Sequence, residues 1–250
     1  MSAHKKTALV TGASAGLGAE FCRQLAEQCE VIIAVARRPD RLQALKRELD
    51  GRAELHAIEG DLSTIEGVAR TIESIRQQGP VDYLVNNAGF STYGMFEDQL
   101  IDGQQEMVSV HINATMALCR AAIPFMRELG GGHIINVSSL SAFLPGRGLS
   151  VYGATKAFLN FYSQSLQMEL ADSGITVQAL CPGYTRTDFH STQEFSQFDT
   201  AQIPDEYWMD SASVVSISLA AVGAGKVIVV PGEKNLELAK KGAQQQCEVF

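Results

Sequence analysis

A tyrosine and a lysine, Tyr152 and Lys156, lie four residues apart in a stretch whose apolar residues recur at helical spacing. On a helix this spacing places both side chains on one face, one turn apart. A free phenol has a pKa of about 10 and exchanges protons poorly at neutral pH. An ammonium about 4 Å away, at an effective dielectric constant of about 20, is worth about 4 kcal/mol and would lower that pKa by about 3 pH units. The pair therefore predicts proton transfer at Tyr152, supported by Lys156.

A glycine-rich turn over residues 12–18 follows the first apolar run and leads into a helical segment that starts at Leu17. Such a turn forms an anion site, because free backbone N–H groups and the positive end of the helix dipole face the ligand. Its spacing is G-x-x-x-G-x-G rather than G-x-G-x-x-G, and no Walker lysine follows. We expect it to hold the phosphates of a dinucleotide cofactor. The residues expected to do so are Gly12, Ser14, Ala15, Gly16, Leu17 and Gly18.

The same turn also contains the pattern G-x-S-x-G, with Ser14 at its centre, which marks the nucleophile of some hydrolases. In those enzymes the turn follows a strand in the middle of the sheet, whereas here it follows the first strand of the chain. The one downstream pair that could complete a triad, Asp188 and His190, is too closely spaced for that role. Cofactor binding is therefore the favoured interpretation, and a hydrolase remains the alternative.

Two arginines, Arg37 and Arg38, follow the second apolar run, and the next acidic residue is Asp40. In a dinucleotide-binding fold the end of the second strand meets the adenosine ribose, where a carboxylate favours NAD and an arginine favours the 2′-phosphate of NADP. A guanidinium can form two parallel hydrogen bonds to a phosphate. We therefore predict that NADP(H) is preferred, with NAD(H) as the alternative. The other interpretation is that both arginines only begin a solvated helix that also carries Arg41.

Short apolar runs alternate with longer helical segments along the chain. The runs expected to form strands are 7–10, 31–36, 53–58, 82–85, 133–137, 175–180 and 227–230. Helices are expected near 17–29, 40–50, 64–78, 104–129, 151–172 and 211–222. Several runs are almost continuously apolar, which is typical of parallel strands covered on both faces. This order predicts a Rossmann-type, doubly wound α/β fold, with a mostly parallel sheet of seven strands and helices on both faces.

The chain has 250 residues, is 46% hydrophobic and carries a formal net charge of −8. This composition excludes wholesale disorder, and the acidic balance disfavours nucleic-acid binding. No apolar run approaches the ~18 residues of a membrane span, and the first residues do not resemble a signal peptide, so we expect a cytoplasmic protein without membrane contact. The cysteines and histidines show no metal-ligand spacing, so no metal is expected. We expect one NAD(P)-binding domain over 1–250, with a substrate loop or lid at about 184–209.

Further motifs agree with these features in order and spacing. Asn-Asn-Ala-Gly at 86–89 and Asn-Val-Ser-Ser at 136–139 each end an apolar run, and Asn113 lies within a helical segment. Together with the glycine turn and the Tyr-Lys pair, they resemble the short-chain dehydrogenase/reductase family over about residues 6–188. The resemblance implies an NAD(P)(H)-dependent oxidoreductase that reduces a ketone or aldehyde to an alcohol, or catalyses the reverse reaction.

The resemblance also implies a role for each motif residue. Tyr152 would be the general acid in reduction and the base in oxidation, and Lys156 would lower its pKa and hold the nicotinamide ribose. Ser139, rather than Ser138, would hydrogen-bond the substrate's carbonyl oxygen. Asn113 would hold a water that links Lys156 to solvent. The further cofactor contacts it implies are Asp61 and Leu62 at the adenine, Asn87, Ala88 and Gly89 along the cofactor, and Pro182, Gly183, Thr185 and Thr187 at the nicotinamide carboxamide.

Aromatic residues are concentrated late in the chain, with six of the eighteen lying between residues 184 and 208. Apolar walls around a few polar groups are typical of a small-molecule pocket, although these rings could instead fill a core or a dimer interface. No Lys or Arg lies in 187–225, and Arg147 and Arg186 are the nearest partners for an anionic substrate. We therefore predict a largely apolar ketone or aldehyde, or its alcohol.

Several alternatives remain open at this level. The same chemistry would serve a dehydrogenase of a hydroxy acid, a sugar or a steroid. A non-catalytic dinucleotide-binding sensor is a different class of protein, and the intact Ser139, Tyr152 and Lys156 argue against it. We also expect a homo-oligomer, either a dimer or a tetramer. The chain lacks the glycine-rich strand tip of several acyl-carrier-protein reductases, because 229–234 reads Val-Val-Pro-Gly-Glu-Lys before a polar, helix-like tail.

Overall fold

The computed structural model describes residues 4–191 and 198–248. Within them, seven strands form one sheet in the order β3-β2-β1-β4-β5-β6-β9, and every neighbouring pair is parallel. The strands are β1 (Thr7–Thr11), β2 (Val31–Ala36), β3 (Glu54–Glu59), β4 (Tyr83–Asn86), β5 (Gly132–Val137), β6 (Ile175–Leu180) and β9 (Ile228–Val229). Each lies within one residue of its predicted bounds, and the predicted fold class is confirmed.

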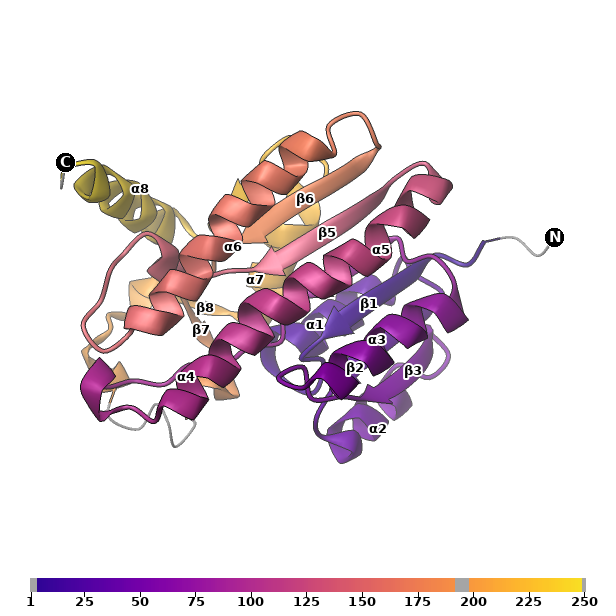
Figure 1. Cartoon of the computed structure of the whole chain (residues 1–250), viewed down its shortest axis with the longest axis horizontal. Coiled ribbons are helices and arrows are strands. Elements are labelled where there is room, and N and C mark those ends of the chain that lie inside the picture. The colour runs from indigo at the N-terminus through magenta and orange to yellow at the C-terminus, as the bar shows by residue number, and fades with distance from the viewer. Residues whose placement is uncertain (1–3, 192–197, 249–250) are drawn as a thin grey trace.

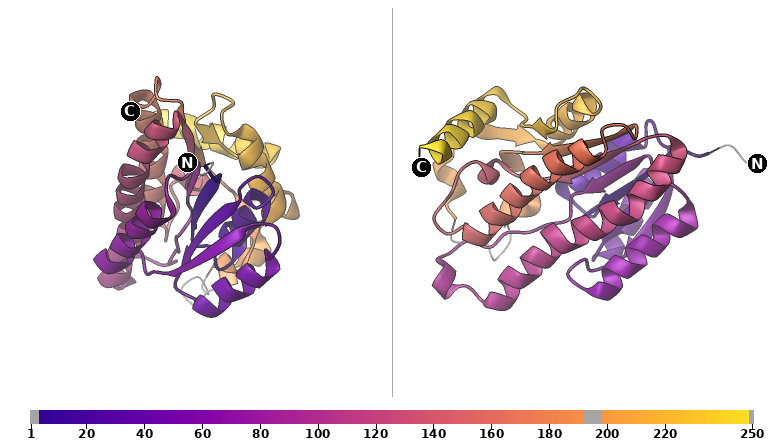
Figure 2. Two further views of the ribbon diagram at one scale, coloured as in Figure 1. Left: turned by 90° about the vertical axis from the view of Figure 1, so that its right-hand side faces the viewer. Right: turned by 45° about the horizontal axis from the view of Figure 1, so that its top comes forward.

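Helices cover both faces of this sheet (Figures 1 and 2). Their bounds are α1 (Gly16–Leu25), α2 (Pro39–Glu48), α3 (Ile65–Gln78), α4 (Ile101–Val108), α5 (Thr115–Leu129), α6 (Ser150–Glu169), α7 (Ser211–Ala221) and α8 (Glu233–Cys247). The core side chains of α1, α2 and α7 pack on one face of the sheet, and those of α3, α5 and α6 pack on the other. The carboxyl ends of the strands therefore meet along one edge of a three-layer sandwich.

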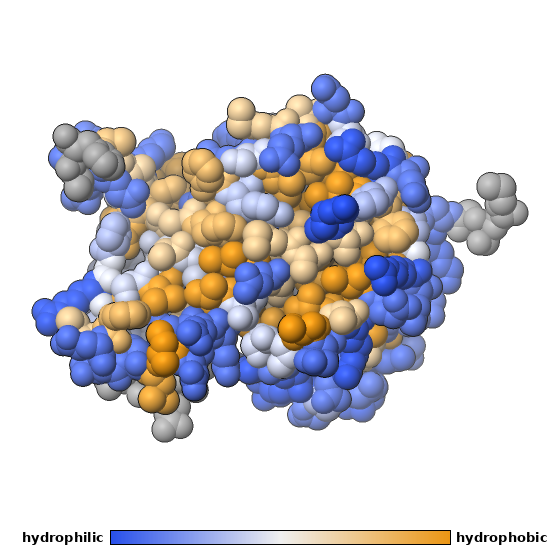
Figure 3. Space-filling model, viewed as in Figure 1, coloured by the Kyte–Doolittle hydropathy of each residue, from blue (hydrophilic) through white to orange (hydrophobic). Residues whose placement is uncertain are grey.

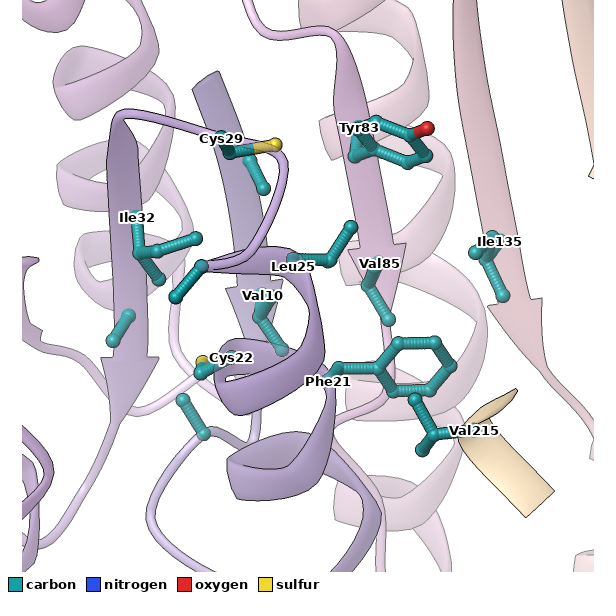
Figure 4. Close-up of a cluster of buried hydrophobic side chains, with 14 of the residues drawn as sticks. Val10, Phe21, Cys22, Leu25, Cys29, Ile32, Tyr83, Val85, Ile135 and Val215 are labelled. Carbon is teal, nitrogen blue, oxygen red and sulfur yellow. The ribbon is translucent and has the colours of Figure 1, made fainter. Parts of the chain in front are cut away.

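Successive side chains of β1 point to opposite faces of the sheet, and the core accordingly has two halves. Val10 belongs to the cluster under α1, whereas Leu9 belongs to the cluster under α5 and α6, and both are fully buried. Figure 4 shows the Phe21 ring of α1 between Val85 of β4 and Val215 of α7. Burying a side chain of this size contributes about 1.5–3 kcal/mol, so this contact fixes α1 and the turn before it against the sheet.

Two short strands occur where the sequence analysis placed only a loop. β7 (Tyr184–Arg186) and β8 (Trp208–Asp210) pair in parallel as a separate two-stranded sheet. They tie the two ends of the 184–209 segment together beside the carboxyl ends of the main strands (Figure 1). Residues 192–197, which include Phe195, lie outside the described residues, and a lid function for this segment stays a prediction.

The predicted helix over 104–129 is interrupted. The π-helical turn Ser109–Ala114 separates α4 from α5. π-Helical turns insert one residue into a helix and often occur at functional sites. Buried residues continue through it, since Val110, His111 and Ala114 are all buried.

The last helix, α8, packs against the segment after β5. Gly242 allows this contact, because a Cβ at its position would overlap the carbonyl oxygen of Phe143. Gln246 donates from Nε2 to the same carbonyl oxygen at 3.0 Å. Leu238 of α8 consequently reaches the cavity described below.

The outer face of α5 and α6 carries apolar side chains in solvent (Figure 3). Phe161 and Met168 on α6 are 75% and 80% exposed. This face is a candidate surface for the expected homo-oligomer, which stays a prediction. No helix in the described part of the chain is long and apolar enough to cross a membrane.

Candidate active site

A cavity of about 720 Å³ lies where the carboxyl ends of the strands meet. Each of the first six strands of the main sheet delivers a lining residue from the loop that follows it: Gly12, Arg37, Gly60, Asn87, Ser138 and Pro182. Parallel strands present their loops at one edge, which is where doubly wound sheets bind ligands. Every residue predicted to contact the cofactor lines this cavity except Gly18, and Ser139 lines it too.

The glycine turn is held tightly against the end of β4. The Thr11 hydroxyl accepts hydrogen bonds from the backbone N–H groups of Asn87 (2.9 Å) and Ala88 (3.0 Å), and the Asn87 amide donates to the Thr11 carbonyl oxygen (2.9 Å). Gly12 has a φ of +67°, and a Cβ there would lie 2.7 Å from Asn87 Nδ2. A Cβ on Gly18 would overlap the Gly12 carbonyl oxygen. Gly12 thus allows the turn, and Gly18 allows the helix to pack beneath it.

The N-terminus of α1 opens toward the cavity with its backbone donors available. Its first turn holds no acidic residue, and its N-cap, Ala15, forms no side-chain hydrogen bond. Ser14, Ala15, Gly16 and Leu17 all line the cavity. Because backbone N–H groups and the helix dipole both favour an anion here, the turn can cradle a phosphate group.

Arg38 joins this turn to the end of β2. Its Nε and Nη2 donate to the Ser14 hydroxyl oxygen at 3.1 and 2.8 Å. Arg37 is exposed beside it and contributes to the field at Asp61. Burial raises the pKa of Asp61, but two hydrogen bonds from Ser63 and the Arg37 charge outweigh this, so the net pKa is lowered. The two arginines therefore form a positive rim where the cavity meets β2 and β3.

Ser139, Tyr152 and Lys156 come together at the other end of the cavity. The Ser139 side chain lies close enough to the Tyr152 hydroxyl to lower the pKa of that phenol. Lys156, only 5% exposed, donates from Nζ to the Val137 carbonyl oxygen at 2.9 Å. The hydroxyl of Ser138, by contrast, donates to the Lys156 carbonyl oxygen at 2.9 Å. The structure thus places Ser139, and not Ser138, beside Tyr152.

The pKa of Tyr152 differs from the lowered value that the Tyr-Lys spacing alone predicted. Burial raises the pKa of Tyr152 to about 12, and the nearby Ser139 side chain only partly offsets that effect. Burial also lowers the pKa of Lys156 to about 7. Its Nζ lies 5.6 Å from the centre of the Tyr152 ring. In the chain itself, burial therefore sets the balance, and Tyr152 is a neutral phenol at neutral pH.

Asn113 is not brought to the site. It is exposed in the π-helical turn and does not line the cavity. Its expected role, holding a water that links Lys156 to solvent, stays a prediction. The buried face of this segment passes through Gln104, Met107, His111 and Ala114. The spacing of that stripe, three or four residues, is the signal that could have separated His111 from Asn113.

The cavity's remaining walls are mainly apolar and aromatic. The Phe189 ring lies 6.1 Å from the Tyr152 ring, and Tyr93 meets Phe198 edge to face at 5.2 Å. Further lining side chains are Phe90, Leu140, Leu144, Leu149, Tyr184 and Leu238. Pro182, Gly183, Thr185 and Thr187 form the wall between this region and the glycine turn. A Cβ on Gly16 would lie 3.2 Å from Thr187 Cγ2, so the two segments nearly touch.

Comparisons with known proteins agree with this architecture. The family model described as short chain dehydrogenase matches residues 6–197. An uncharacterized oxidoreductase of Staphylococcus epidermidis is 31% identical over 194 residues, which cover 77% of this chain and 84% of that protein. The chain belongs to the short-chain dehydrogenase/reductase family, and it is an NAD(P)-dependent oxidoreductase of that family.

Solved structures extend the likeness beyond the region that the family model matches. A short-chain dehydrogenase from Sphingobium yanoikuyae in complex with NADPH has a TM-score of 0.85 and 31% identity, covering 98% of this chain and 95% of that one. A bulky-bulky ketone specific alcohol dehydrogenase from Comamonas testosteroni has a TM-score of 0.80 and 28% identity, with coverage of 98% and 94%. The fold of the C-terminal quarter is therefore shared with these proteins as well.

Proposed function

We propose that this protein uses NADPH to reduce a bulky, largely apolar ketone to a secondary alcohol. The observation that carries the proposal is that Ser139 and Tyr152 lie together in the wall of a cavity whose other walls are largely apolar and aromatic. The structural likeness to an alcohol dehydrogenase described as specific for bulky-bulky ketones supports the same substrate class.

The residues of the cavity suit a dinucleotide that carries a 2′-phosphate. The Gly12 position leaves no room for a side chain, and the helix N-terminus of α1 offers free donors to the pyrophosphate. Arg37 and Arg38 lie at the end of β2, where the adenosine ribose binds in this fold. The Sphingobium structure, described as a complex with NADPH, supports this choice.

Each catalytic side chain has a distinct task in the proposed reaction. The bound cofactor supplies the hydride. The hydroxyl groups of Ser139 and Tyr152 donate hydrogen bonds to the carbonyl oxygen and stabilise the negative charge that develops there. Tyr152 then gives its phenolic proton to that oxygen. Lys156 holds positive charge behind the phenol, which favours the tyrosinate left after proton transfer.

A series of phenyl alkyl ketones tests the substrate class. We expect kcat/KM with NADPH to rise by about fourfold for each added methylene that the cavity buries, because burying a CH₂ group is worth about 0.8 kcal/mol. The measurement is steady-state NADPH oxidation across the methyl, ethyl, propyl and butyl members.

Two alanine variants serve as controls for this series. Phe189→Ala removes an aromatic wall beside Tyr152 and should flatten the dependence on chain length. Phe161→Ala removes a ring of the same size from the outer face of α6 and should leave the dependence unchanged. A wild-type rate that does not depend on chain length contradicts the proposed substrate class.

Arg147 favours a second candidate, a ketone that carries a carboxylate away from the reacting carbon. It lines the cavity, and its Nε donates to the thioether sulfur of Met95 at 3.2 Å. A thioether is a weak acceptor, and a guanidinium has five donors, so most of its hydrogen-bonding capacity can serve a ligand.

A phenyl ketone that ends in a carboxylate, compared with its methyl ester, tests this candidate. If Arg147 binds the carboxylate, the wild type should prefer the acid by about tenfold to a hundredfold, which is the worth of a hydrogen bond to a charged group. Arg147→Gln should abolish that preference and leave the rate with the ester unchanged. Arg186→Gln is the matched control, because Arg186 already pairs with Asp205 at 3.0 Å. Equal rates with acid and ester in the wild type would exclude the candidate.

A further inference from the structure

A buried histidine lies directly behind the proposed proton donor. His111, in the π-helical turn between α4 and α5, is 1% exposed. Its ring lies 5.9 Å from the Tyr152 ring, centre to centre, and meets it nearly at right angles. His111 does not line the cavity, and the mechanism above gives it no task.

The hydrogen bonds of His111 fix the position of its proton. Nε2 lies 3.3 Å from the backbone nitrogen of Phe90, which can only donate, so Nε2 must be the unprotonated acceptor. Nδ1 therefore carries the proton and donates to the Thr155 hydroxyl oxygen at 2.8 Å. That hydroxyl in turn donates to the backbone carbonyl oxygen of Tyr152 at 2.8 Å. The chain of hydrogen bonds runs in one direction, from Phe90 to Tyr152.

His111 is held neutral in this position. Burial lowers its pKa well below the usual range, and the Lys156 charge lowers it further. With Nδ1 donating to Thr155 and Nε2 accepting from Phe90, neither ring nitrogen is available to take a proton from Tyr152. This arrangement is unsuited to a proton relay and suited to holding neighbouring groups in place.

The groups that His111 contacts belong to both halves of the site. Phe90 follows the 87–89 turn, which lines the cavity, and a Cβ on Gly89 would lie 2.6 Å from His111 Nε2. Thr155 lies on α6 directly before Lys156 and three residues after Tyr152. One imidazole thus bridges the turn after β4 and the helix that carries both proposed catalytic side chains.

We propose that His111 is a positioning residue, which holds Tyr152 and Lys156 in register with the 87–89 turn through Thr155. The expected kinetic effects rest on the proposed function. The hydrogen-bonded arrangement of His111 does not depend on it. His111 lies on the buried side of the π-helical turn, whereas Asn113 in the same turn is exposed.

Paired substitutions test the role by kinetics. Thr155→Val removes the hydroxyl without changing the side-chain shape, and His111→Phe keeps a ring without its nitrogens. We expect each to lower kcat by about tenfold to a hundredfold, since a misplaced catalytic group costs up to about that factor. The dissociation constant for NADPH should change by less than about twofold. Thr155→Ser keeps the hydroxyl and should restore kcat.

The double variant and the pH profile separate positioning from simple destabilisation. If the two residues act as one unit, the loss in the double variant equals that of the single variants instead of their product. The shape of the kcat–pH profile should stay that of the wild type, whereas a lost proton relay would change it. A multiplied loss, an altered profile, or a Thr155→Ser variant as slow as Thr155→Val overturns the proposal.

A spectroscopic measurement tests the arrangement even if the wild type reduces none of the ketones. In a heteronuclear NMR spectrum of protein with labelled histidines, the His111 signal, assigned by its loss in His111→Phe, should report a neutral ring protonated at Nδ1. The signal should change in Thr155→Val and recover in Thr155→Ser. A ring protonated at Nε2, or a charged ring at neutral pH, overturns the proposal. Absence of turnover with every ketone, together with the expected spectrum, contradicts the proposed function alone.

Discussion

Replacing Tyr152 by Phe is expected to lower kcat for ketone reduction by about a hundredfold to ten-thousandfold, the usual contribution of a positioned general acid. The substitution removes one oxygen atom and keeps the ring that packs against His111 and Phe189. Because burial raises the pKa of Tyr152 to about 12, the phenol is fully protonated at neutral pH and can act as the donor without any prior ionisation. The variant is measured by NADPH oxidation under saturating ketone, with NADPH binding measured separately by fluorescence.

Tyr162→Phe provides the matched control for this experiment. Tyr162 lies on the same helix, α6, packs against the core cluster that contains Cys119, and does not line the cavity. Losing its hydroxyl should leave kcat close to the wild-type value. A Tyr152→Phe variant that retains more than a tenth of the wild-type kcat would mean that another group donates the proton, and the mechanism proposed above would fail.

The raised pKa of Tyr152 also bears on the direction of the reaction. Oxidation of an alcohol needs the tyrosinate as base, which burial disfavours, whereas reduction uses the phenol that burial preserves. Lys156, whose pKa is lowered to about 7, loses its positive charge as the pH rises through neutrality. The charge that would favour a tyrosinate is thus weakened at the alkaline pH where a tyrosinate could form. The chain alone therefore presents Tyr152 in the protonated form that reduction uses.

Most of the framework of the site could be predicted from local patterns in the sequence. The continuous apolar runs identified the parallel strands, because both faces of this sheet are covered. Since every parallel strand delivers its following loop to the same edge, residues as distant as Gly12 and Pro182 could be expected in one cavity. Ser139 was separated from Ser138 by its distance from Tyr152, and the structure turns only Ser138 toward the Lys156 carbonyl.

The features that were missed depend on contacts between distant residues. β7 and β8 have three residues each and pair across more than twenty residues of chain, so neither has a periodic pattern of its own. The contacts of His111 with Phe90 and Thr155 join segments 21 and 44 residues away in the chain, which no pattern within 101–129 reports. The pKa values of Tyr152 and Lys156 follow from burial, which spacing along one helix cannot report.

Removing both arginines at the end of β2 is expected to reverse much of the cofactor preference. Each hydrogen bond from a guanidinium to a phosphate is worth about 1.5–3 kcal/mol, so the Arg37→Ala, Arg38→Ala double variant should lose about a hundredfold or more in kcat/KM for NADPH. The value for NADH should change little, because NADH has no 2′-phosphate to lose contact with. Steady-state kinetics with the two cofactors at one ionic strength give the ratio directly.

Single variants then divide this effect between the two side chains. Arg38 is already oriented by its hydrogen bonds to Ser14, so less side-chain freedom is lost when it binds a phosphate. We therefore expect Arg38→Ala to account for more of the loss than Arg37→Ala. Arg41→Ala, an exposed arginine in the first turn of α2, is the matched control and should leave the ratio unchanged. If Arg38→Ala lowers kcat/KM equally with NADPH and NADH, Arg38 instead maintains the shape of the glycine turn. The preference for NADPH would then come from other residues.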